Sequence, residues 1–309
     1  MGKKVALHNL GCKVNAYEVE AMQQLLEEAG YEIVPFAPGA DIYVINTCTV
    51  TNIADRKSRQ MLHKAKKMNP DAIVVAAGCY VQTDKEKLET DGQIDVILGN
   101  NRKREIVEVL EEYQQEKAGQ ERVININQTK EYEQLSIDRT AEHVRAYIKV
   151  QDGCNQFCTY CIIPYARGRV RSRKKEDILK EIRSLAAKNY KEVVLTGIHL
   201  SSYGVDFPEG EKETLLSLIE EVHKVEGIRR IRLSSLESGI ITEEFVKKIS
   251  ELPKVCPHFH LSLQSGSDSV LKRMNRRYTS QEYEERCGLL RKYYTNPALT
   301  TDIITGFPG

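Results

Sequence analysis

The first 117 residues repeat one pattern: a short run rich in β-branched residues, a turn, and a segment with helical periodicity. Such alternation is typical of a parallel, doubly wound sheet whose strands are buried on both faces. Asn15 with Glu18, and Thr83 with Glu86, have the spacing of a helix capping box. The expected strands are Val5–Leu10, Asp41–Asn46, Ala72–Ala77 and Asp95–Leu98, and the clearest helices are Ile53–Met68 and Arg102 to about Glu116.

Cysteine stands on the turn after each of the first three strands. Cys12, Cys48 and Cys79, called here the strand-end trio, are far apart in the sequence. Turns that follow parallel strands lie at one edge of the sheet, where ligands bind, so the three should converge. A single cysteine there is commonly a small core residue. Three at the same structural position favour a three-cysteine ligand set.

The rest of the chain contains a second βα series. Residues 118–143 are polar and indicate a linker with one short strand, Val123–Asn127, so the expected domains are 1–117 and 144–309. Five further βα units predict a partial parallel barrel, which makes the fold class α/β with two domains. Its expected strands are Ala146–Val150, Val193–Thr196, Arg230–Ser234, Phe259–Leu263 and Leu299–Ile304; its expected helices are Lys175–Lys188, Thr214–Val225, Thr242–Glu251 and Ser280–Tyr293, with a short turn at Ser269–Met274.

A C-x3-C-x2-C run follows the first barrel strand. Cys154, Cys158 and Cys161, the loop trio, supply three thiolates, and three ligands on a four-iron cubane leave one iron open. The alternatives are a zinc knuckle and a disulfide cluster. Zinc would need a fourth ligand, and the nearest histidine, His143, lies before the strand.

Composition narrows the setting. No stretch reaches the ~18 apolar residues of a membrane span, and the N-terminus lacks the apolar core of a signal peptide. Eight cysteines without an export signal favour reduced thiols in the cytoplasm. Cys256 and Cys287 have no matching partners and are interpreted as packing residues.

The net charge of +1 does not indicate a nucleic-acid binder, but charge gathers locally. The run 167–175 holds six cations and follows the loop trio. Its arginines could grip phosphates bidentately, whereas most charge runs are solvated faces offset by acids. The candidate RNA contacts are Arg167, Arg169, Arg171 and Arg173.

Tyr160, directly before the last cysteine, makes the loop trio similar to the motif of radical S-adenosylmethionine (SAM) enzymes. Together with the strand-end trio, essentially the whole chain resembles the radical SAM methylthiotransferases. The strings nearest to the branch that acts on N6-threonylcarbamoyladenosine in tRNA are Leu10-Gly-Cys-Lys-Val-Asn15, Asn46-Thr-Cys-Thr-Val-Thr-Asn-Ile-Ala-Asp55 and Gly78-Cys-Tyr80. Lys13-Val14 departs from the Gln-Met of the isopentenyladenosine branch and the Pro-Lys of the ribosomal-protein branch.

The resemblance implies two [4Fe–4S] clusters. The loop trio would hold the radical SAM cluster, and the strand-end trio an auxiliary cluster that presents sulfur. One SAM would donate a methyl group, and a second would generate the radical that takes hydrogen from C2 of the adenosine at position 37, next to the anticodon. The implied partners are this tRNA and a low-potential electron donor such as flavodoxin or ferredoxin. A monomer without a membrane partner is expected.

SAM contacts are expected after successive barrel strands. Many radical SAM enzymes carry Gly-Gly-Glu after the second strand, whereas Thr196-Gly-Ile-His199 has no acid, so this contact must come from elsewhere. The hydroxyls at 234 and 235 could instead cap a strand end, and the amide at 264 could be a satisfied core group. The candidates are Gly197, Ser234, Ser235, Glu237, Gln264, Ser265 and Arg277.

Two further expectations follow from the resemblance. Family members continue into a sixth barrel strand and a C-terminal β-domain that grips tRNA, so the chain is expected to be truncated after the fifth strand. The alternatives in function are a methylthiotransferase acting on isopentenyladenosine tRNA or a ribosomal protein, and a non-catalytic iron–sulfur or zinc module that binds RNA.

Overall fold

The computed structural model describes residues 2–116, 119–140, 145–211 and 213–308, and the chain forms two compact units. The first unit is Met1–Ile137 with Ile162–Arg169, and the second is Asp138–Cys161 with Val170–Gly309. These limits differ from the expected ones, because most of the expected linker 118–143 and the short segment 162–169 both belong to the first unit. Residues 117, 118 and 141–143, where two expected boundaries fall, lie outside the described residues, and so does His143.

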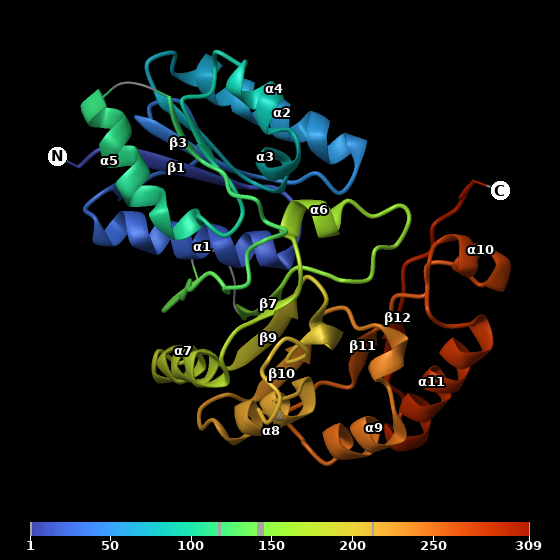
Figure 1. Ribbon diagram of the computed structural model, residues 1–309. Helices are drawn as coiled ribbons and strands as arrows, with labels where there is room; N and C mark the ends of the chain where they lie inside the picture. The colour runs from blue at the N-terminus through green and yellow to red at the C-terminus, as the bar shows by residue number, and fades with distance from the viewer. Residues whose placement is uncertain (1, 117–118, 141–144, 212, 309) are drawn as a thin grey trace. The chain divides into compact units, whose positions relative to one another are not determined.

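The first unit is a parallel sheet of six strands in the order β2-β1-β3-β4-β5-β6. Helices cover both of its faces (Figure 1), which confirms the doubly wound fold. The strands are β1 Lys4–Asn9, β2 Glu32–Ile33, β3 Ile42–Thr47, β4 Ile73–Gly78, β5 Val96–Leu98 and β6 Gln120–Arg122. The helices are α1 Lys13–Glu28, α2 Asn52–Met68, α3 Cys79–Thr83, α4 Lys85–Glu89, η1 Lys103–Glu105, α5 Ile106–Glu116 and α6 Ile163–Arg167.

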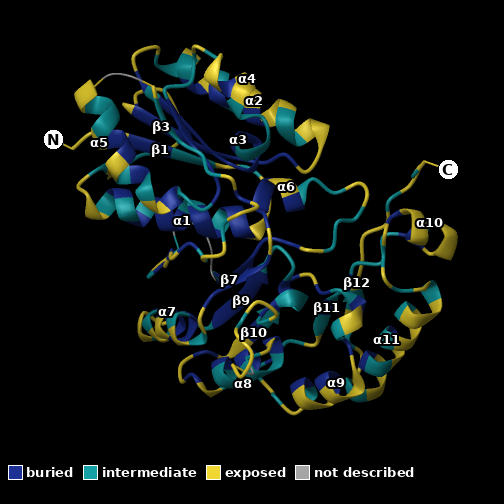
Figure 2. Ribbon diagram, viewed as in Figure 1, coloured by how far each residue is buried: buried dark blue, intermediate teal, exposed yellow. Residues whose placement is uncertain are grey.

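Strand β3 shows why this sheet is buried on both sides. All six of its residues are buried (Figure 2). Successive side chains along a strand point to opposite faces of the sheet. Ile42 and Val44 pack in the cluster with α1 and α5, and Tyr43 and Ile45 pack in the cluster with α2. A strand apolar on both faces needs helices on both, so the fold follows from the continuous apolar runs.

The second unit is an open barrel-like βα array. Strands β10-β9-β7 pair in parallel, β8 adds to β7 in antiparallel, and β11 pairs with β12 in parallel. The parallel bridge Leu236↔Leu261 links the β10 side to the β11 side, and no strand closes a barrel among the described residues. The strands are β7 Ala146–Asp152, β8 Arg171–Ser172, β9 Glu192–Gly197, β10 Arg230–Leu233, β11 His258–His260 and β12 Ala298–Thr300; the helices are α7 Lys175–Ala187, η2 Leu200–Ser202, α8 Leu215–Lys224, η3 Ser238–Ile240, α9 Glu243–Ser250, α10 Asp268–Arg273 and α11 Ser280–Tyr293.

Both capping-box predictions are wrong. Helix α1 begins at Lys13 with Cys12 as its N-cap, so Asn15 and Glu18 lie inside the helix, and both are buried. Thr83 ends α3 instead of starting a helix. The polar groups at 15 and 18 are used for tertiary contacts, which the spacing alone does not distinguish from local caps.

The predicted strand Val123–Asn127 is also wrong, because the strand in this region is β6, three residues earlier. Its backbone pairs with β5 in the register Ile97↔Glu121. The chain shows no apolar repeat there, so pairing with a sheet edge decides the position. The two-residue strands β2 and β8 and the short helix α6 had no sequence signal.

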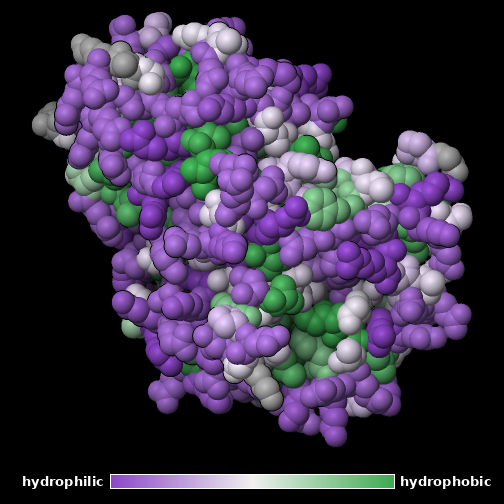
Figure 3. Space-filling model, in the orientation of Figure 1, coloured by the Kyte–Doolittle hydropathy of each residue, from purple (hydrophilic) through white to green (hydrophobic). Residues whose placement is uncertain are grey.

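No helix among the described residues is long and apolar enough to cross a membrane. On the face drawn in Figure 3, hydrophilic residues predominate over the surface.

Candidate active site

The structure brings the strand-end trio together at one edge of the first unit. Cys12 caps α1 after β1, Cys48 follows β3, and Cys79 opens α3 after β4. Strand β3 lies between β1 and β4, so the three turns are neighbours. A Cβ atom on Gly11 would stand 3.1 Å from Cys48 Sγ, which shows how closely the first turn approaches the second.

A glycine makes the third turn possible. Gly78 adopts φ 98° and ψ −152°, a region that is essentially restricted to glycine. A Cβ atom there would also lie 2.4 Å from Asn46 Oδ1 and 2.8 Å from the Thr47 carbonyl oxygen. Residue 78 must therefore be glycine for Cys79 to enter α3 beside Cys48.

The strand-end sulfurs share one electrostatic environment. Cys12 keeps exposed surface, but desolvation by the surrounding protein atoms raises the pKa of its thiol, while Arg167 and the backbone N–H of Asn15 lower it. Burial likewise raises the pKa of the Cys48 thiol, and the backbone N–H of Val50 lowers it. Cys79 raises the pKa of both other thiols, so the three cysteines interact electrostatically.

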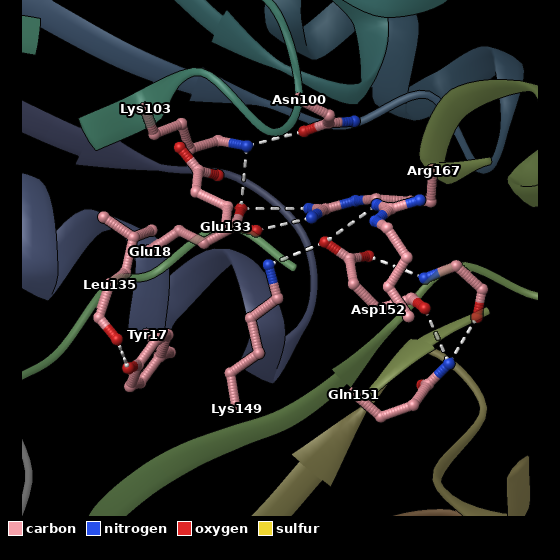
Figure 4. Close-up of polar contacts among 12 residues, drawn as sticks. Tyr17, Glu18, Asn100, Lys103, Glu133, Leu135, Lys149, Gln151, Asp152 and Arg167 are labelled. Carbon is pink, nitrogen blue, oxygen red and sulfur yellow. Dashed lines mark hydrogen bonds and ion pairs between the residues drawn. The ribbon is translucent and has the colours of Figure 1, made fainter. Parts of the chain in front are cut away.

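Cys79 has side-chain donors on its sulfur. Arg167 Nε donates to Cys79 Sγ at 3.1 Å, and Asn100 Nδ2 lies 3.6 Å from the same sulfur. Arg167 Nη1 and Nη2 both bind the Glu18 carboxylate, and Lys103 Nζ stands 3.1 Å from Glu18 Oε2 (Figure 4). All four side chains around this sulfur lie within the first unit and are fully buried.

The loop trio lies in the segment after β7. The turn needs two positive φ angles, 73° at Gly153 and 51° at Phe157. Thr159 ties the loop to the end of α10, because its N–H donates to the Met274 carbonyl (3.2 Å) and its hydroxyl to the Arg273 carbonyl (2.9 Å).

The loop trio also has donors aimed at sulfur. The pKa of the Cys154 thiol is raised to about 11, chiefly by burial. The backbone N–H of Gln156 lowers it, and Cys161 and Cys158 contribute to the rise. Arg276 Nη1 donates to Cys158 Sγ at 3.3 Å. Two of the three sulfurs, those of Cys154 and Cys158, are thus supplied with N–H groups of the kind that stabilise thiolate ligands.

An acid lies beside the loop trio. Glu237, after β10, accepts from Gln156 Nε2 at 3.1 Å, lies 3.1 Å from His199 Nε2 and 3.4 Å from Arg276 Nη2. Burial raises the pKa of this carboxyl, but the hydrogen bond and charge of His199, with Arg276 and Arg277, hold it below its usual value. The turn after β9 has no acidic residue of its own. Glu237 therefore supplies a carboxylate to this turn through its contact with His199.

The other SAM candidates occupy different settings. Gly197 makes room for Gln151, since a Cβ atom there would lie 2.8 Å from Gln151 Oε1. Ser234 is buried, and among the described residues its hydroxyl has no hydrogen-bond partner. Ser265 is buried and accepts from the Ser267 N–H, whereas Ser235 and Arg277 are exposed. Gln264 has φ 68° and pairs through its backbone with Asp302.

The predicted contact with RNA phosphates is wrong for three of the four arginines. Arg167, Arg171 and Arg173 are buried, with ion-pair partners Glu18, Asp152 and Glu181 respectively. Charge-assisted pairing inside the protein takes the donors that phosphates would need. Arg169 is exposed.

Comparisons with known proteins agree with this arrangement. Residues 4–99 match the uncharacterized protein family UPF0004, and residues 148–309 match the Radical SAM superfamily. Threonylcarbamoyladenosine tRNA methylthiotransferase MtaB of Bacillus subtilis is 44% identical over 305 residues, 99% of this chain and 67% of the relative. MtaB of Aquifex aeolicus is 45% identical over 305 residues, 99% of this chain and 73% of the relative. The chain belongs to the radical SAM methylthiotransferases.

A solved structure supports the fold. The radical SAM methyltransferase TsrM from Kitasatospora setae superposes with a TM-score of 0.65 over 98% of this chain and 67% of that chain, at 16% identity. The methylthiotransferase is thus an enzyme that uses SAM and a [4Fe–4S] cluster, as its superfamily does.

The residues of the second unit fit such a cluster. Among the described residues, no three His, Cys, Asp or Glu side chains stand close enough to share a single metal ion. A cubane gives each thiolate its own iron, so its ligand sulfurs need not converge on one point.

Several polar residues around the two trios were missed or misread. Arg276 lies in a basic run that resembles a solvated face, and Asn15 and Glu18 resemble a cap. Glu18 occupies the buried face of α1 with Val14, Tyr17 and Ala21. An acid at the i+3 and i+4 spacing of an apolar stripe was the available signal. Asn100, in the loop after β5, and Lys103, the first residue of η1, carried no such signal.

Proposed function

We propose that this enzyme adds a methylthio group to C2 of N6-threonylcarbamoyladenosine at position 37 of tRNA. One SAM would act as methyl donor and another as radical source. The carrying observation is the convergence of Cys12, Cys48 and Cys79 at a ligand-binding sheet edge in a chain whose other half is a radical SAM unit. Both relatives compared above are named for the threonylcarbamoyl substrate.

The chemistry divides between the trios. When bound, a cluster on the loop trio would supply the electron that cleaves SAM, and a second cluster on the strand-end trio would present the sulfur for the transfer. The six cysteines hold these groups as thiolates, and the N–H donors beside them stabilise that charge. Hydroxyls cannot replace the thiolates, because soft sulfur ligands select iron–sulfur clusters.

Glu237 is proposed to bind the amino group of SAM. Its carboxylate is ionised, since its pKa is held low, and it faces the β9 turn through His199. Ser234 offers a buried hydroxyl at the end of β10. The remaining candidate SAM contacts are proposed only because they follow successive barrel strands. They are Gly197, Ser235, Gln264, Ser265 and Arg277. Arg169 is the retained candidate for tRNA phosphate.

Charge and cofactor requirements suggest the partners. A low-potential donor such as flavodoxin or ferredoxin would supply the electron, and the cytoplasm would supply both tRNA and reducing conditions. We expect the enzyme to act as a monomer.

The substrate assignment is tested by incubating the reconstituted enzyme with each of four substrates. These are tRNAs with threonylcarbamoyladenosine, isopentenyladenosine or unmodified adenosine at position 37, and a ribosomal-protein substrate. Mass spectrometry of nucleosides and peptides, with 5′-deoxyadenosine as a measure of SAM cleavage, reports the products. Methylthiolation confined to the threonylcarbamoyl tRNA is expected. Product only on isopentenyladenosine or on protein would move the enzyme to another branch, and no product with bound RNA would favour a non-catalytic module.

A further inference from the structure

One buried arginine reaches the strand-end trio from far along the sequence. Arg167 follows Cys79 by 88 positions and has no exposed surface. Its Nε donates to Cys79 Sγ at 3.1 Å. Its other two nitrogens bind the Glu18 carboxylate, and Nη2 also donates to Asn15 Oδ1 at 2.6 Å.

The guanidinium is fixed by a second layer of contacts. Lys103 Nζ pairs with Glu18 at 3.1 Å and donates to Asn100 Oδ1 at 2.6 Å. Asn100 Nδ2 in turn donates to the carbonyl oxygen of Ala166, next to Arg167, at 2.7 Å. Glu18 and Asn15 would suffice to anchor the side chain, so the Nε–H directed at sulfur is a feature that anchoring does not require.

Arg167 and Glu18 place opposite charges in one buried cluster. The cation contacts Cys79 Sγ directly through Nε–H. It thus favours negative charge on this sulfur, while the acid paired with it opposes that effect.

We propose that Arg167 is a positioning residue that raises the reduction potential of the iron–sulfur cluster held by the strand-end trio. The inference rests on the proposed function, which puts a cluster there. Hydrogen bonds to ligand sulfurs and nearby charge are principal determinants of cluster potential. In the step concerned, the cluster gains one electron and an external low-potential reductant loses one, with no bond made or broken. A fixed cation and an N–H···S bond stabilise the more negative, reduced state.

The test uses the full chain with Cys154, Cys158 and Cys161 changed to alanine, so that only the strand-end cluster contributes. The protein is reconstituted with iron and sulfide without oxygen and titrated with dithionite and mediators, and the reduced cluster is followed by electron paramagnetic resonance. Arg167→Gln is expected to lower the equilibrium constant for one-electron reduction about tenfold. This corresponds to a reduction potential about 59 mV more negative. Glu18→Gln is expected to shift the potential in the opposite direction.

Two controls separate tuning from folding. Arg173→Gln removes another buried arginine from an acid, Glu181, in the second unit, and it should leave this potential unchanged. Circular dichroism checks that each variant is folded. If Arg167→Gln does not fold, the potentials of Arg167→Lys and Glu18→Gln test the proposal instead. The lysine retains the charge without the Nε–H, so it should lower the reduction potential by less than the shift expected for the glutamine.

The outcomes are distinct. Opposite shifts in the arginine and glutamate variants support the inference. An unchanged potential in Arg167→Gln, or in both Arg167→Lys and Glu18→Gln where those decide, overturns it while leaving the proposed cluster intact. A folded background protein that takes up no iron overturns the proposed strand-end cluster and this inference together.

Discussion

The two cysteine trios are assembled in opposite ways. The loop trio comes from one segment of eight residues after β7, whereas the strand-end trio comes from the ends of β1, β3 and β4. The spacing of the loop trio is therefore local. The spacing of the strand-end trio depends on the sheet register, which pairs Asn9 with Asn46 and Thr47 with Gly78. The local trio and the distributed trio should thus respond differently to mutation.

The trios also share a feature. In each, an arginine from a distant part of the chain directs an N–H at one sulfur: Arg167 at Cys79 (3.1 Å) and Arg276 at Cys158 (3.3 Å). Such outer contacts orient ligands and stabilise thiolate charge. The parallel suggests that both sites are built for anionic sulfur, whatever the source of the cysteines.

The largest expected effect separates the chemical roles of the trios. Cys158→Ala should abolish both SAM cleavage and methylthiolation, because the loop trio would lose its cluster. Cys12→Ala should abolish methylthiolation but retain cleavage of SAM to 5′-deoxyadenosine. Chromatography of 5′-deoxyadenosine and of modified nucleoside from the same reactions tests this. Methylthiolated product from Cys12→Ala would refute the role of the strand-end trio.

Next in size is the loss of the arginine beside the loop trio. Arg276→Gln removes the donor to Cys158 and the partner of Glu237. Loss of such an outer contact should lower SAM cleavage or cluster retention about 10–100-fold. Arg273→Gln, on the exposed end of α10, is the matched control. Equal rates of SAM cleavage and equal cluster retention in the two variants would show that Arg276 does not support the loop trio.

A third prediction tests the dependence of the strand-end trio on backbone geometry. Gly78→Ala should lower the free energy of unfolding by about 3 kcal/mol, since it combines a glycine-only conformation with a clash at Asn46. Gly30→Ala has φ 86° but open space around its Cβ, and should cost about 1–2 kcal/mol. Urea unfolding at one pH measures both values. If the two variants lose equal stability, packing at residue 78 is not limiting.

The smallest effect concerns the one exposed arginine of the 167–173 set. Arg169→Gln should weaken tRNA binding a few-fold and reduce the slope of log affinity against log salt by about 0.7–0.9, the value for one phosphate contact. Arg183→Gln, exposed on α7, provides the comparison. Filter binding at several salt concentrations gives both slopes. Identical slopes would remove Arg169 from the RNA interface.

The contrast between local and distributed ligand sets also explains what the sequence could predict. Continuous apolar runs such as residues 42–45 determine buried strands, and strand order then brings Cys12, Cys48 and Cys79 to one edge. The loop trio was recognisable from its spacing alone. The loop trio and each buried strand are patterns within single segments, and the convergence of the three strand ends follows from the shared edge of a parallel sheet.

Contacts between distant polar side chains could not be predicted in this way. Arg167 belongs to a run whose alternation resembles an RNA-binding surface, yet its partner Glu18 is 149 positions away. Whether an arginine is buried depends on an acid that the local pattern does not specify. The same holds for β6, whose position is determined by pairing with β5 and has no apolar repeat of its own.

Iron and acid-labile sulfide per reconstituted chain measure whether each trio holds a cluster. Two cubanes give about eight irons in the unaltered protein. We expect about four after alanine replacement of either the strand-end trio or the loop trio, with a different electron paramagnetic resonance spectrum in each. About four irons in the unaltered protein, all lost with the loop trio and none with the strand-end trio, would contradict this expectation.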